Sequence, residues 1–142
     1  MVEMELSKII IDEKRHDQVI VLKEKSGGRL LPIVIGITEA AAIKMQLAGV
    51  YPPRPMTHDL LKTILEDLDA HVDKIIIDKL EENTFHAKIV ITLEGKVKII
   101  DSRPSDSIAL AVRTKSPIFV EDEVLNKANP FGEVDIHDDP SS

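Results

Sequence analysis

The chain has 142 residues and a mass of 15.8 kDa, which is the size of one domain. It contains no cysteine, so disulfides and thiolate metal sites are excluded, and its formal net charge of −7 argues against broad electrostatic attraction to nucleic acid. Aromatic residues make up only 3% of the chain, so Ile, Leu, Val and Ala must form the core.

The first residues, MVEMELSKIII, lack the basic segment and the small-residue cleavage site of a signal peptide. No apolar run approaches the ~20 residues that a membrane-spanning helix needs. We therefore expect a soluble, cytoplasmic protein without a membrane partner.

The first half of the chain predicts three strands and then two helices. Apolar alternation and turn signals predict strands at residues 2–11, 18–24 and 30–36. Thr38 is expected to cap a helix near residues 38–48, and Gly49 suits its C-terminal end. Three prolines in YPPRP, residues 51–55, exclude regular structure there. Thr57 is then expected to cap an amphipathic helix near residues 57–68.

The second half predicts a meander of strands, a third main helix and a short final helix. The meander comprises strands at residues 72–80, 84–93 and 97–101, joined by short polar turns. Pro104 is expected to begin a helix near residues 104–114, because proline suits the first helical turn. A short strand at 117–120 and a short helix at 121–128 follow.

Short turns between most of the strands are typical of antiparallel pairing. We predict a single α+β domain over residues 1–130, with a largely antiparallel sheet and three main helices packed on it. Residues 131–142 form an acidic tail, which we expect to be disordered.

Polar residues cluster at each of the three main helix starts. The clusters are Thr38 and Glu39; Arg54, Thr57, His58 and Asp59; and Asp101, Arg103, Ser105 and Asp106. Free N–H groups at a helix start favour phosphate, and arginine offers a bidentate fork to the same oxygens. Carboxylates hold Mg²⁺ or Mn²⁺, and a histidine serves as general base or ligand. We expect the three helix starts to lie close together.

Each cluster also has a purely structural interpretation. Thr57 and Ser105 are typical capping residues, and Glu39 suits the positive end of a helix dipole. Arg103 could simply pair with Asp101 and Asp106. Capping explains His58 less well than the other residues, because histidine is not a favoured residue at a helix start. The other histidines are interpreted as surface residues: His16, His71, His86 and His137.

Three stretches together resemble the bifunctional nuclease family: LPIVIGITEA at 31–40, YPPRPMTHDLL at 51–61 and IDSRPSDSIALAVR at 100–113. The resemblance covers about residues 1–130. It implies an α+β fold, a homodimer, and metal-supported hydrolysis of phosphodiester bonds in both DNA and RNA.

The resemblance carries over to the motif positions of this chain: Glu39, Arg54, Pro55, Thr57, His58, Asp59, Asp101, Arg103, Pro104, Ser105 and Asp106. On this hypothesis the catalytic set is His58, Asp59, Asp101, Asp106 and Glu39, and the metal ligands (for Mg²⁺ or Mn²⁺) are Asp59, Asp101 and Asp106. The residues expected to bind phosphate are Arg54, Thr57, Arg103 and Ser105.

Two other classes of function stay open at this point. A non-catalytic module could bind a nucleotide or a protein at the same helix starts, or the clusters could only cap and pair within a structural dimer. The acidic charge and the absence of a basic surface interleaved with aromatic residues favour these alternatives. A homodimer is also expected from residues 30–50, which are almost all apolar or small.

Overall fold

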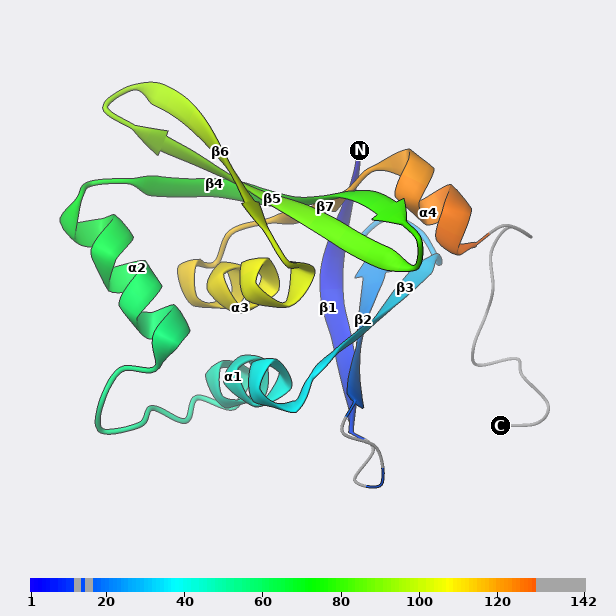
Figure 1. The fold of residues 1–142 in the computed structure, drawn as a ribbon, viewed down its shortest axis with the longest axis horizontal. Coiled ribbons are helices and arrows are strands. Elements are labelled where there is room, and N and C mark those ends of the chain that lie inside the picture. Colours follow the sequence, from blue (N-terminus) through cyan, green and yellow to red (C-terminus); the bar gives the residue numbers. More distant parts are fainter. Residues whose placement is uncertain (12–13, 15–16, 130–142) are drawn as a thin grey trace.

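The computed structural model describes residues 1–11, 14 and 17–129 (Figure 1). They form one seven-stranded sheet with the strand order β3-β2-β1-β7-β4-β5-β6. The strands are β1 (Val2–Ile11), β2 (Asp17–Glu24), β3 (Leu30–Gly36), β4 (His71–Glu81), β5 (Thr84–Leu93), β6 (Lys96–Ser102) and β7 (Ile118–Val120). The expected tail at 131–142 lies outside the described residues, as do His16 and His137.

The sheet is mixed. Every neighbouring pair is antiparallel except β4 and β7, which are parallel. The prediction of a largely antiparallel sheet is confirmed, with this one exception. The parallel pair arises because a helix carries the chain from the end of β6 back across the sheet, and such a crossover returns the next strand in the same direction.

Four helices accompany the sheet, rather than three. They are α1 (Ile37–Leu47), α2 (Thr57–Asp67), α3 (Pro104–Thr114) and α4 (Asp122–Ala128). The first three correspond to the three predicted main helices. The short helix expected at 121–128 is α4, and it has to be counted with them because Val124 and Leu125 are buried in the core.

The twisted sheet has two halves that run at a steep angle to each other, with α1 and α3 in the corner between them (Figure 1). Strand alternation puts Leu31, Ile33 and Ile35 of β3 into the core and leaves Val34 exposed. Helix α3 is the most buried helix and packs against α1, α2, β4 and β5. The first turn of α3 is therefore well packed, with Pro104 and Ser105 buried.

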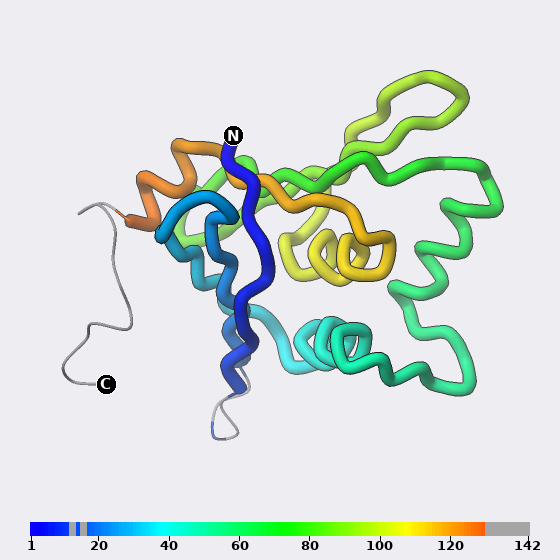
Figure 2. Tube along the Cα trace, turned by 180° about the vertical axis from the view of Figure 1, so that it is seen from behind, coloured from blue at the N-terminus to red at the C-terminus, as the bar shows by residue number. Residues whose placement is uncertain are grey.

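Helix α2 lies at the periphery, as the view from behind also shows (Figure 2). It packs on α3, and its only fully buried residue is His58. Most of its apolar side chains stay exposed, namely Leu60, Leu61 and Ile64, as does Leu68 directly after its end. Within the described part of the chain, no helix is long and apolar enough to cross a membrane.

The helix starts differ from the predicted ones in how they are capped. Thr38 and Thr57 lie inside the first turns of α1 and α2, whose N-cap residues are Gly36 and Met56. Asp59 takes the capping role in α2, because its Oδ2 accepts a hydrogen bond of 2.9 Å from the Met56 amide. After α1 the chain turns at Gly49, whose φ of +70° suits glycine, as predicted.

Candidate active site

The starts of α1, α2 and α3 meet through a chain of side-chain contacts. His58 Nε2 lies 3.0 Å from Asp106 Oδ1, which joins α2 to α3. Arg103 Nε donates to Asp106 Oδ2 at 3.0 Å, and Arg103 Nη2 donates to Glu39 Oε1 at 3.2 Å, which joins α3 to α1. The expectation that these three helix starts lie close together is confirmed. Residues from three separate stretches of sequence thus form one polar cluster, which we call the helix-start cluster (Glu39, His58, Arg103 and Asp106).

The cluster is buried at one end and open at the other. The side chain of His58 is 10% exposed, whereas that of Arg103 is 68% exposed. Asp106 lies between them and contacts both. Burial acts to raise the pKa of Asp106, but hydrogen bonds from His58 and Arg103 outweigh it and hold that pKa below its ordinary value. Asp106 is therefore a carboxylate near neutral pH and orients the imidazole of His58.

The absence of a side chain at position 36 leaves space for the Glu39 carboxylate at the start of α1. Gly36 lies directly under the Glu39 carboxylate, and a side chain at position 36 would collide with it. Because position 36 is glycine, the Glu39 carboxylate can fold back over the helix start, where its other oxygen meets Arg103.

Asp59 belongs to a second, more buried contact that sequence analysis did not predict. Its Oδ1 accepts a hydrogen bond of 2.7 Å from Nε of Arg113, whose side chain is only 3% exposed. The Met56 amide and then Arg113 hold the pKa of Asp59 below its ordinary value. Arg113 also donates to the carbonyls of Ala109 in α3 and Ala42 in α1. Arg113 thus connects all three helices beneath the helix-start cluster.

One signal in the sequence could have found Arg113. It lies seven residues after Asp106, which is about two helical turns, so both side chains leave the same face of α3. That face meets α2, where the adjacent residues His58 and Asp59 receive them.

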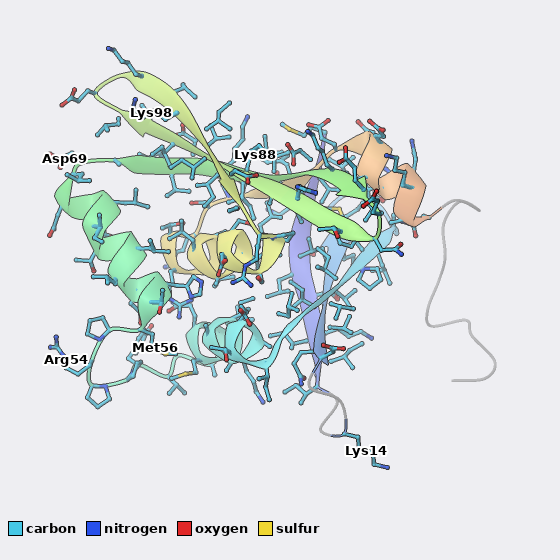
Figure 3. The ribbon with its side chains drawn as sticks, viewed as in Figure 1. Lys14, Arg54, Met56, Asp69, Lys88 and Lys98 are labelled. Atoms are coloured by element: carbon cyan, nitrogen blue, oxygen red, sulfur yellow. The ribbon has the colours of Figure 1, made fainter. Side chains whose placement is uncertain are left out.

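Asp101 is placed elsewhere. It pairs with Lys88 of β5 at 2.9 Å, and Lys88 also lies 3.5 Å from Asp78 of β4. The Lys88 hydrogen bond holds the pKa of Asp101 below its ordinary value. Lys88 lies on the sheet in Figure 3, and its neighbour Ala87 is part of the core, so the polar row faces away from the core.

The remaining predicted residues do not join the helix-start cluster through side-chain contacts. Arg54 and Thr57 are exposed and have no hydrogen bond or ion pair with a described residue, and Arg54 lies on the outer loop before α2 (Figure 3). Ser105 is buried in the first turn of α3. Thr38 is exposed, as is His71, whereas His86 is half-buried.

The proposed metal ligands are not gathered into one ligand set. Asp59, Asp101 and Asp106 each pair with basic side chains at different places. Among residues 1–11, 14 and 17–129, no group of three or more His, Asp or Glu side chains is placed to hold a metal ion. As arranged, these residues do not fit a three-ligand metal site, and metal dependence stays a prediction.

Comparison with known proteins places this chain in a family. The family model for the bifunctional nuclease domain matches residues 20–131. The uncharacterised protein Rv1829 of Mycobacterium tuberculosis is 41% identical over 128 residues, which cover 90% of this chain and 76% of that protein. Bifunctional nuclease 2 of rice (Oryza sativa subsp. japonica) is 29% identical over 114 residues, and bifunctional nuclease 1 of Arabidopsis thaliana is 26% identical over 112 residues.

The two plant relatives are much longer proteins. The matches cover 78% and 77% of this chain but only 35% and 34% of the plant proteins. The family model covers most of the chain, including the whole helix-start cluster. The chain therefore belongs to the bifunctional nuclease domain family.

Proposed function

We propose that this protein is a nuclease that hydrolyses phosphodiester bonds of DNA and RNA with little sequence preference. The observation that carries the proposal is the His58–Asp106 contact beside the exposed Arg103 at the meeting point of three helix starts. Family membership supports the same reaction class, because plant relatives bear the name bifunctional nuclease.

The cluster offers a base and an anion-binding group. In this proposal Nε2–H of His58 donates a hydrogen bond to the Asp106 carboxylate, and the lone pair on Nδ1 accepts a proton from water. The water oxygen then bonds to phosphorus, the bond from phosphorus to the leaving ester oxygen breaks, and that oxygen takes up a proton from solvent. Arg103 keeps N–H groups free for a phosphate oxygen, because its two described contacts use Nε and one hydrogen of Nη2.

The other predicted residues have different parts in this proposal. Asp59 positions α2 through Arg113, and Glu39 positions Arg103. Arg54, Thr57 and Ser105 remain predicted phosphate-binding residues at the same helix starts. A divalent metal such as Mg²⁺ or Mn²⁺ would shield phosphate charge and activate water.

A digestion assay tests the proposal. The purified protein is incubated with plasmid DNA and with RNA in Mg²⁺, in Mn²⁺ and in EDTA. We expect cleavage of both substrates with a metal present, and a large loss of cleavage in Asp106→Asn. Asp122→Asn is the matched control, because Asp122 pairs with the N-terminus at the start of α4. If neither substrate is cut under any condition, the alternative of a non-catalytic binding module replaces the proposal.

We also propose that the protein is a homodimer. In the stretch 30–50, Leu31, Ile33 and Ile43 are buried within the chain, but Val34 and Leu47 are 64% and 56% exposed. Leu60, Leu61 and Ile64 of α2 are exposed as well, and a second copy of the chain would cover apolar side chains of this kind. Light scattering at micromolar concentration is expected to give about twice the 15.8 kDa of one chain. A mass of one chain at that concentration would contradict the proposal.

A further inference from the structure

An open groove of about 440 Å³ lies beside the helix-start cluster. Its walls are the edge strand β3, the turn between β4 and β5 with the first residues of β5, and the start of α3. Arg103 lines this groove and also contacts Asp106, so the groove leads directly into the cluster. Its volume is within the range of sites that bind small molecules.

The end of the groove at α3 has the chemistry of a phosphate site. The exposed Arg103 guanidinium lies there, and Pro104 and Ser105 form the first turn of α3. Gly36, the N-cap residue of α1, lines the same groove. The start of α3 and the arginine thus border one space and both favour an anion, whereas the Glu39 carboxylate covers the start of α1.

Another part of the lining has the chemistry of a base site. Phe85 lines it, and only two phenylalanines, Phe85 and Phe119, are among the described residues. Aromatic rings stack on nucleobases of any sequence. Asp17 and Asn83 also line the groove, and their side chains can pair with the polar edges of a base.

The wall that carries Asn83 is held by a tight turn. Glu82 and Asn83 both have positive φ, of 50° and 62°, and connect β4 to β5 directly. Two-residue turns of this kind fix the positions of the strands that they join. Phe85, the second residue of β5, packs against the hydrophobic core and so has a fixed position before any ligand arrives.

We propose that this groove binds one nucleotide unit of a single-stranded nucleic acid, with its base against Phe85 and its phosphate at Arg103. The inference rests on the proposed nuclease function and deepens it, since it names the form of the substrate. A base can reach Phe85 only when it is unpaired, so single strands are bound in preference to duplexes. Stacking does not distinguish one base from another, which agrees with the low sequence preference of the proposed nuclease.

The free edge of β3 could instead pair with an extended peptide. Arg103 and the start of α3 at one part of this space favour a phosphate-bearing ligand over a neutral peptide strand. Nucleic acid is therefore the occupant that these two features support.

The experiment measures binding by fluorescence anisotropy in EDTA with two labelled ten-nucleotide strands. One is ordinary single-stranded DNA, and the other has the same backbone but carries no bases. We expect the wild-type protein to bind the ordinary strand at least about fivefold more tightly, which is the lower end of what stacking one base contributes. Phe85→Leu is expected to remove this preference, and Arg103→Gln to weaken binding of both strands. Equal affinity of the wild-type protein for the two strands, or binding of neither, would overturn the proposal.

Phe119→Leu is the matched control, because Phe119 lies on β7 next to Lys74 and does not line the groove. It is expected to keep the preference for the ordinary strand, and loss of the preference in this variant as well would overturn the assignment to Phe85. The outcome is separable from that of the nuclease proposal. Cleavage without a preference for bases overturns the groove alone, whereas a preference for bases without cleavage supports the groove and overturns the nuclease.

Discussion

Replacing His58 with Asn is expected to lower the rate of phosphodiester cleavage by about 100- to 10,000-fold, the range that general base catalysis contributes. Asparagine has no ring nitrogen whose lone pair accepts a proton at neutral pH. The loss should appear in kcat rather than in KM, because Arg103 and the groove still bind the phosphate backbone. Initial rates on a fluorescently labelled oligonucleotide over a range of concentrations measure both constants.

His71→Asn provides the control for this experiment. His71 is exposed at the start of β4, where its partner is Asp73, and it contacts no member of the helix-start cluster. We expect it to cleave at the wild-type rate. A His58→Asn variant that keeps its circular dichroism spectrum and also cleaves at the wild-type rate would show that His58 is not the base.

Replacing Arg113 with Met is expected to lower the free energy of unfolding by about 3 kcal/mol. The substitution leaves Asp59 without its cation and removes the donors to the carbonyls of Ala42 and Ala109. The estimate is at the lower end of the range for broken buried pairs, because Asp59 is 29% exposed and water can partly replace the lost partner. Urea unfolding followed by circular dichroism measures the difference.

Arg103→Met is the matched control, since Arg103 also pairs with two carboxylates but is 68% exposed. Exposed ion pairs contribute up to about 1 kcal/mol, so this variant should lose much less stability than Arg113→Met. Similar losses in the two variants would contradict the view that burial makes Arg113 the connection between the helices. Because Arg113 holds α2 in place, its variant is also expected to cleave more slowly.

Local sequence patterns determined the elements and their order. Pro104 and the apolar spacing after it predict a helix near 104–114, and the structure has α3 at Pro104–Thr114. The expected short helix at 121–128 is α4 at Asp122–Ala128. These predictions succeed because periodicity and proline act within a few residues. The prediction that Thr38 and Thr57 cap their helices was wrong: both lie inside the first turns, and at the start of α2 Asp59 accepts a hydrogen bond from the Met56 amide.

The sequence also identified the polar clusters at the three helix starts, and the same stretches carry the resemblance to the family. The contacts between these clusters depended on how the helices pack. His58 and Asp106 are 48 residues apart, and they meet only because α2 and α3 pack side by side. Arg103 reaches Glu39 across 64 residues for the same kind of reason, since α1 packs against α3.

Asp101 shows most clearly what only the tertiary structure decided. In the sequence it is five residues from Asp106 and looks like part of the same site. It lies on β6, whereas Asp106 lies on α3, and strand alternation turns its side chain to the face of the sheet away from the core. There Lys88 of the neighbouring strand pairs with it. Arg113, seven residues beyond Asp106, is brought under the site instead, because a helix returns to the same face about every 3.6 residues.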